Sequence, residues 1–143
     1  MGVASPDVGA YQQSLSELQA AVITHQNDAA STVTSQDCTS EHRRYEDVAR
    51  HQLGQMTNMS GGMDNCGRAM GHAGPFDLAS TCGSMQNELD RHASEACRGD
   101  AAANHAEAAR HCQVMRDWLA REQVGVDSMS RMGGMMGGGR CSR

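Results

Sequence analysis

Residues 8–29, VGAYQQSLSELQAAVITHQNDA, carry the pattern that decides the fold of this chain. Their apolar and aromatic residues recur at alternating spacings of three and four, and one histidine shares that spacing. These positions are Val8, Tyr11, Leu15, Leu18, Val22, His25 and Ala29. Such spacing places side chains on one face of an α-helix, where they can pack against other helices. The stretch therefore predicts a helix with a single inward-facing stripe.

Three further segments repeat this pattern, over residues 38–63, 78–96 and 101–129, and the sequence has no strand-like alternation. The last stripe contains one polar lapse, Glu122. Four such helices joined in sequence predict an all-α fold, an antiparallel four-helix bundle with up-down-up-down topology. The bundle consists of two helical hairpins. The expected helices cover about residues 7–33, 39–60, 76–97 and 101–130, within a bundle domain of residues 1–130.

Two segments rich in glycine and methionine remain outside these helices. One is the middle connection around MTNMSGGMDNCGRAMGH, residues 56–72, and the other is a flexible tail at residues 131–143. In an up-down-up-down bundle, both lie at the end opposite the two tight hairpin turns. We therefore expect a loop and a tail that meet at one end of the bundle.

The two halves of the chain also resemble each other. A shift of 67 residues brings His25 onto His92, and a shift of 63 brings His42 onto His105. The two shifts differ by about one helical turn. An ancient duplication of one hairpin is one explanation, and chance similarity is the other.

Large aliphatic residues are scarce. Six Leu, eight Val, one Ile and one Phe make 16 of 143 residues, where a share below about 20% is typical of disordered chains. Disorder normally also requires a large net charge, and here the net charge is only −5. Alanine, methionine and cysteine can all be buried in place of the missing residues. We expect a folded domain with a thin core that needs covalent staples.

The six cysteines are the candidate staples. They are even in number and scattered without a CxxC pair, which favours a disulfide framework over a zinc ribbon or a thioredoxin-like site. Disulfides imply an oxidising compartment, so we expect a periplasmic or secreted protein. The alternative is a cytosolic protein with six free thiols. The expected pairs are Cys38–Cys97 at the hairpin turns, Cys82–Cys112 between adjacent stripes, and Cys66–Cys141 between the middle connection and the tail.

Several classes of function are excluded by the composition. All 12 basic residues are arginine, they form no patch, and only four residues are aromatic, so nucleic-acid binding is not expected. The longest apolar stretch, LQAAVI, is too short to span a membrane. No phosphate loop, catalytic nucleophile or Glu-x-x-His motif is present. The protein is therefore not expected to be an enzyme.

Four histidines lie on the predicted stripes, one on each helix. Neutral imidazole nitrogen is a common ligand of zinc, copper and haem iron, and cofactor sites in bundles are built from facing stripe residues. We expect one shared buried metal site, and the alternative is interior histidines hydrogen-bonded to the backbone. His51 and His111 follow Ala-Arg in both halves but fall beside the stripe, so we expect them at the surface. The candidate ligands are His25, His42, His92 and His105.

The methionines suggest a second site. Thioether sulfur is a soft, uncharged ligand that selects Cu(I). The two glycine- and methionine-rich stretches resemble the Met-rich segments of bacterial periplasmic copper-handling proteins. This resemblance implies copper or silver binding and nothing about the fold. The alternative is that the first three methionines continue the helical stripe as core filler. The candidate ligands are Met56, Met59, Met63, Met132, Met135 and Met136.

These features predict a non-catalytic copper-binding bundle that sequesters its ion or delivers it to a metal-transfer partner protein. Cu(I) would bind at the methionine-rich end, and Cu(II), Zn(II) or a second copper at the histidines. The first alternative is an electron-transfer protein with haem b held between His25 and His92, against which the shortage of large apolar residues stands. The second is a cofactor-free structural or partner-binding bundle.

Overall fold

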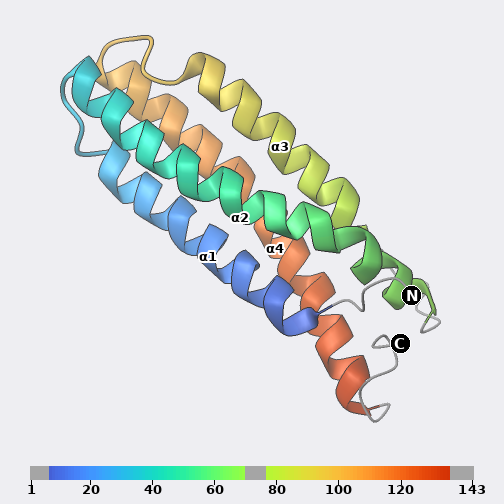
Figure 1. Cartoon of the computed structure of the whole chain (residues 1–143). Helices are drawn as coiled ribbons and strands as arrows, with labels where there is room; N and C mark the ends of the chain where they lie inside the picture. The colour runs from blue at the N-terminus through green and yellow to red at the C-terminus, as the bar shows by residue number, and fades with distance from the viewer. Residues whose placement is uncertain (1–6, 70–76, 136–143) are drawn as a thin grey trace.

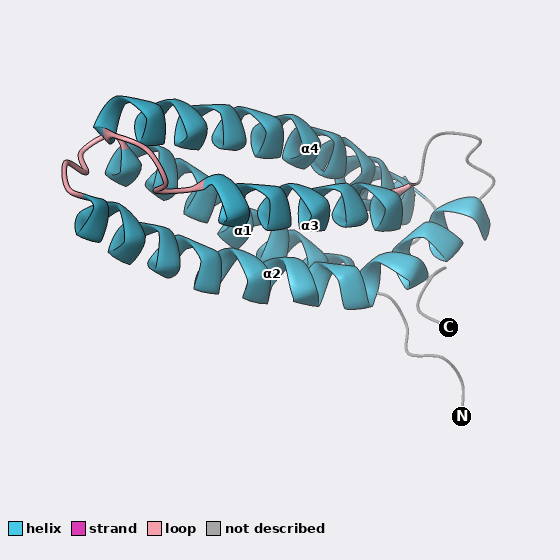
Figure 2. Ribbon diagram, turned by 90° about the horizontal axis from the view of Figure 1, so that it is seen from above, coloured by secondary structure: helices cyan, strands magenta, loops and turns pink. Residues whose placement is uncertain are grey.

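The computed structural model describes residues 7–69 and 77–135, with side chains as far as residue 131. It contains four helices, α1 (Val8–Ala29), α2 (Ser35–Ala69), α3 (Leu78–Glu95) and α4 (Ala101–Met135), and no strand within those ranges. Helix α1 packs against α2 and α4, and α3 packs against the same two helices. Figures 1 and 2 show neighbouring helices running antiparallel. The predicted up-down-up-down four-helix bundle is confirmed.

Both short connections, residues 30–34 and 96–100, lie at one end of the bundle, which we call the hairpin end (Figure 1). At the opposite end lie the start of α1, the end of α2, the start of α3 and the end of α4. None of the helices described is long and apolar enough to cross a membrane.

Helix α2 is longer than predicted. It continues to Ala69, so the loop expected around residues 56–72 is helical over 56–69, and residues 70–72 lie outside the described ranges. The buried positions Met56, Ser60 and Met63 continue the helical spacing there, and packing against the bundle outweighs the weak helix propensity of the intervening glycines. Helix α4 likewise continues to Met135, into the segment expected as a tail.

Methionine supplies much of the core. Met56 and Met63 have no exposed surface and belong to one apolar cluster with leucines of the other helices, while Met59 packs against its edge. This packing supports the core-filler alternative, and the assignment of Met56, Met59 and Met63 as copper ligands stays a prediction. Unbranched methionine side chains fill gaps that a chain poor in Leu and Ile would otherwise leave open. The side chains of Met132 and Met135, and the whole of Met136, lie outside the described residues.

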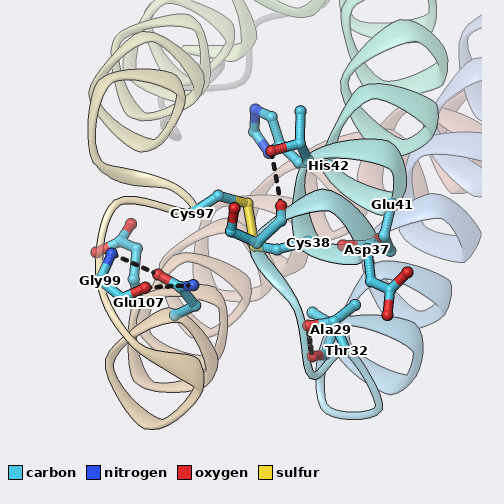
Figure 3. Close-up of a disulfide and its surroundings, with 12 residues drawn as sticks. Ala29, Thr32, Asp37, Cys38, Glu41, His42, Cys97, Gly99 and Glu107 are labelled. Carbon is cyan, nitrogen blue, oxygen red and sulfur yellow. Dashed lines mark hydrogen bonds between the residues drawn. A yellow bond between two sulfur atoms is a disulfide. The ribbon is translucent and has the colours of Figure 1, made fainter.

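The Cys38–Cys97 disulfide is confirmed, with Cα atoms 5.6 Å apart and a sequence separation of 59. It joins the first turn of α2 to the second residue after the end of α3 (Figure 3). Cys97 has a φ of 62°, the left-handed conformation that commonly ends a helix. Closing a loop of this length contributes about 4 kcal/mol to the free energy of unfolding by the chain-entropy relation.

The predicted Cys82–Cys112 pair is wrong, because both residues are buried free thiols. Each points at a different part of α1. The Cys112 thiol donates to the Val22 carbonyl at 3.7 Å, and Cys82 lies 3.5 Å from the Tyr11 hydroxyl. Cys66 is not a free thiol, but its predicted partner Cys141 lies outside the described residues.

The polar lapse in the fourth stripe marks a buried hydrogen-bonded group. Glu122 has no exposed surface, and its carboxyl group accepts hydrogen bonds from the Tyr11 hydroxyl and the Cys82 thiol. Burial raises the pKa of Glu122 from 4.5 to about 7. The folded state therefore prefers the protonated acid at pH values where the unfolded chain has already ionised.

The Glu122→Gln substitution tests this group. Because the folded pKa is raised, the stabilising contribution of Glu122 is complete below pH 4.5 and is lost as pH rises to about 7. The glutamine variant does not titrate and has no such loss. The difference in free energy of unfolding, variant minus native, should therefore increase by about 3 kcal/mol between pH 4.5 and about pH 7. Urea unfolding at a series of pH values measures the difference. A difference that does not change with pH would show that Glu122 does not titrate in this way.

Candidate metal centre

Three of the four predicted histidines converge near the hairpin end. His25 lies in the last turns of α1, His42 two turns into α2, and His92 in the last turn of α3. One ring nitrogen from each lies within 4.8 Å of the other two. His25 and His92 are buried, and the His42 side chain is 13% exposed. Helical spacing alone therefore located three residues from three helices that meet in space.

The two most buried histidines face each other. The Nε2 atoms of His25 and His92 are 3.3 Å apart. The Nδ1 atom of His25 lies 2.6 Å from a carboxylate oxygen of Glu41, and that of His92 lies 2.7 Å from one of Glu107. An ionised carboxylate only accepts hydrogen bonds, so both Nδ1 atoms must carry the proton. In neutral rings this leaves two Nε2 lone pairs directed at each other.

The His92 ring is expected to be neutral. Burial, and then the neighbouring histidines, lower the pKa of His92 from 6.5 to about 3. The Glu107 carboxylate beside it is already paired with Arg91 at 2.6 Å, so it has a cationic partner without an imidazolium. A neutral imidazole is the form that can bind a metal ion.

His42 supplies an imidazole without a hydrogen-bond partner. Its two ring nitrogens are buried and make no hydrogen bond. A Glu46 carboxylate oxygen lies 3.3 Å from Nε2, but the approach does not have hydrogen-bond geometry. Burial is the largest of the effects that lower the pKa of His42. A buried, unpartnered polar group is costly unless something else satisfies it.

The spacing fits a tetrahedral metal ion. Two nitrogens bound at about 2.05 Å to one tetrahedral ion lie roughly 3.3 Å apart. The Nε2 atoms of His25 and His92 have this separation, 3.3 Å. The three histidines also line a cavity of about 10 Å³, on the order of the space that one water molecule needs. The cavity is therefore of the size that a single ion or a single water molecule needs.

The surroundings of the centre are related by an approximate two-fold repeat. In the first hairpin His25 bonds Glu41 and stacks on Tyr45, with ring centroids 4.0 Å apart. In the second, the equivalent residues lie 66 or 67 positions later, and His92 bonds Glu107 and stacks on His111 at 3.9 Å. Sequence reasoning noticed the shift of 67 but missed Glu41, Glu107 and Tyr45. An acidic residue 15 or 16 positions after each histidine was the available signal.

His111 is fully buried, which corrects its predicted surface position. Its Nδ1 atom donates to Glu88 at 2.7 Å, and its Nε2 atom accepts from the Tyr45 hydroxyl at 2.7 Å. The prediction treated the two Ala-Arg-His motifs as equivalent, but they face different sides of their helices. Ala49 is buried and His51 exposed, whereas His111 is buried and the alanine of its motif exposed. The predicted exposure of His51 is confirmed.

His105 does not join the group, which corrects the prediction of a four-histidine site. Its Nε2 atom instead donates to the backbone carbonyl of Thr32, 2.6 Å away, in the connection between α1 and α2. A sequence shift of 63 residues matches His105 to His42, but the two halves of the centre are related by a shift of 66 or 67 residues. At a shift of 66, the residue equivalent to His42 is Ala108, which also lines the cavity.

In comparisons with known proteins, no family model, no curated protein and no solved structure matches this chain. The fold and the cluster define the protein as a four-helix bundle with a buried three-histidine group. A functional proposal for it rests on the chemistry of that group.

Substitution of the two motif histidines distinguishes their roles. His111→Ala leaves a cavity and removes the hydrogen-bond partner of Tyr45 and Glu88, so it should lower the free energy of unfolding by roughly 3 kcal/mol. The matched His51→Ala change removes an exposed ring and should stay within about 0.5 kcal/mol of the native chain. Urea unfolding of both variants at pH 7.5 is the measurement. Equal effects would contradict the observed burial.

Proposed function

We propose that this protein binds one Cu(II) or Zn(II) ion without catalysis, and that it sequesters or delivers that ion. The ligands are Nε2 of His25, Nε2 of His92 and a ring nitrogen of His42. The observation that carries the proposal is the pair of Nε2 atoms 3.3 Å apart, each made an acceptor by a carboxylate on the other side of its ring. A cation between them replaces a repulsion of lone pairs with two bonds.

The two carboxylates support a metal site in a second way. Metal-binding histidines commonly donate their other ring N–H to a carboxylate, which fixes the ring and raises its basicity. Glu41 and Glu107 occupy these positions on His25 and His92. Both are largely buried, with side chains 6% and 16% exposed. They orient the ligands from outside the coordination shell.

The choice of ion follows from the ligand type. Imidazole nitrogen suits both copper and zinc, and affinities for such sites rise from the earlier divalent metals to Cu(II), which exceeds Zn(II). Near-tetrahedral spacing suits Zn(II). The Cys38–Cys97 disulfide supports an oxidising compartment such as the periplasm or the extracellular space, where copper would be in its Cu(II) state.

The small cavity favours binding over catalysis. About 10 Å³ is enough for one ion or water and leaves no room for an organic substrate beside the metal. The same closeness disfavours the haem alternative, because a macrocycle would have to separate two rings whose nitrogens are 3.3 Å apart. The cofactor-free alternative leaves the buried His42 nitrogens without a partner.

Metal titration of the native chain and single variants tests the proposal. One Zn(II) or Cu(II) per chain is expected. His25→Ala, His42→Ala and His92→Ala should each weaken binding by more than the roughly tenfold to hundredfold loss usual for outer-shell changes. Glu107→Gln should fall within that smaller range.

His105→Ala is the matched control, because this histidine also lies at the hairpin end but bonds a backbone carbonyl. It should bind the ion as tightly as the native chain. Competition with a chromogenic chelator measures each dissociation constant. If the native chain binds no ion, or if the His25 and His105 variants behave alike, the three-histidine centre is not the binding site.

A further inference from the structure

The candidate metal centre is divided between the two hairpins. His25 and His42 belong to the α1–α2 hairpin, and His92 belongs to the α3–α4 hairpin. The chain passes from one hairpin to the other between the end of α2 and the start of α3, and both of these helix ends lie at the far end of the bundle (Figure 1). Among the described residues, the Cys38–Cys97 disulfide is the one covalent bond between the hairpins at the end that holds the site.

This disulfide lies next to the ligands on both sides. Cys38 precedes His42 by four residues and therefore shares its face of α2. Cys97 follows His92 by five residues and is the second residue after the end of α3. Both cysteines line the same small cavity as the three histidines. Figure 3 shows the sulfur–sulfur bond with His42, Glu41 and Glu107 around it.

We propose that the Cys38–Cys97 disulfide is a redox switch on the metal centre. In the oxidised chain the bond holds His92 against His25 and His42, and the ion binds tightly. In the reduced chain the hairpin ends can separate, and affinity falls. This inference rests on the proposed function, because it describes how that same site is regulated.

The local forces favour separation once the bond is broken. Without an ion, the Nε2 atoms of His25 and His92 face each other at 3.3 Å, and the two ring nitrogens of His42 make no hydrogen bond. Opening would let water reach all three rings, which lowers the cost of both features. The hydrogen bond from His105 to Thr32 also crosses between the hairpins at this end, but it is noncovalent and can be exchanged for water.

Reduction requires a dithiol, which the proposal names as the co-reactant. One of its thiolates attacks the sulfur of Cys97, the more exposed of the two cysteines, and Cys38 leaves as a thiolate that takes up a proton. The second thiol of the reductant then attacks the mixed disulfide and releases Cys97. The protein gains two electrons and two protons, and the dithiol becomes a disulfide.

Thermodynamic linkage gives the switch two measurable consequences. If oxidation tightens metal binding by some factor, then metal binding must favour the oxidised chain by the same factor. A tenfold difference in affinity corresponds to a decrease of about 30 mV in the reduction potential of Cys38–Cys97 when the site is saturated. The two measurements are independent and must agree.

The test uses the full chain and Zn(II), titrated against a chromogenic chelator under anaerobic conditions. The oxidised chain is compared with the chain reduced by an immobilised dithiol, which is removed before titration, and with the Cys38→Ser/Cys97→Ser variant. We expect binding at least about tenfold weaker in the reduced chain and in the variant, with a matching decrease in potential under saturating Zn(II). The Cys66→Ser chain serves as control and should bind like the native oxidised chain.

The outcomes separate the two proposals. If the oxidised chain binds no Zn(II), the proposed function fails. If it binds Zn(II) but the reduced chain binds equally or more tightly, the switch is wrong and the metal centre stands. Should the double variant fail to fold, the potential of Cys38–Cys97 in the Cys66→Ser chain, with and without Zn(II), decides. A potential that Zn(II) does not change overturns the switch.

Discussion

The chain has too few large apolar residues to fill its own interior, so polar side chains are buried there as well. Each buried polar side chain then needs a hydrogen-bond partner. Tyr11, Glu122 and His111 are completely buried, and each makes hydrogen bonds to other buried groups. A buried polar group without a partner costs a substantial part of the stability of a small domain. The helices are consequently held in register by side-chain hydrogen bonds as well as by apolar contact. Among the side chains that the structure describes, His42 is the exception, because its two buried ring nitrogens make no hydrogen bond.

The approximate two-fold repeat explains how a metal centre can arise at the hairpin end. Each hairpin places a histidine, a carboxylate behind it and an aromatic ring beside it, and the two histidines meet across the repeat axis. His42 breaks this symmetry, because the residue equivalent to it is Ala108. A small residue on one side leaves room for the cavity, and a histidine on the other supplies the third nitrogen. Two equal histidines there would compete for the same space.

The fold was predictable from the sequence because the inward stripes repeat over four long segments. Each helix is indicated by many positions together, so one atypical residue does not change the prediction. The same stripes located His25, His42 and His92, whose ligand atoms meet. They failed for His111, which lies beside the predicted stripe and is nevertheless fully buried. They also failed for His105, which lies on the stripe but bonds a backbone carbonyl. The predicted α2 is too short because a glycine-rich composition favours a loop. The helical spacing of Met56 and Met63 was the signal that the helix continues. The roles of Glu41 and Glu107 depend on contacts with histidines of neighbouring helices. The periodicity of a single helix does not predict such contacts.

The location of the centre beside a disulfide follows from its own chemistry. Without an ion, the facing Nε2 atoms and the His42 nitrogens, which make no hydrogen bond, add to the cost of keeping the hairpin end closed. Helix ends are also where packing is weakest, because neighbouring turns are present on one side only. A covalent bond between Cys38 and Cys97 keeps the ligands together at that end in the absence of metal. The entropy of assembling three histidines from three helices is then largely offset during folding, so the proposed ion would meet a site already in place.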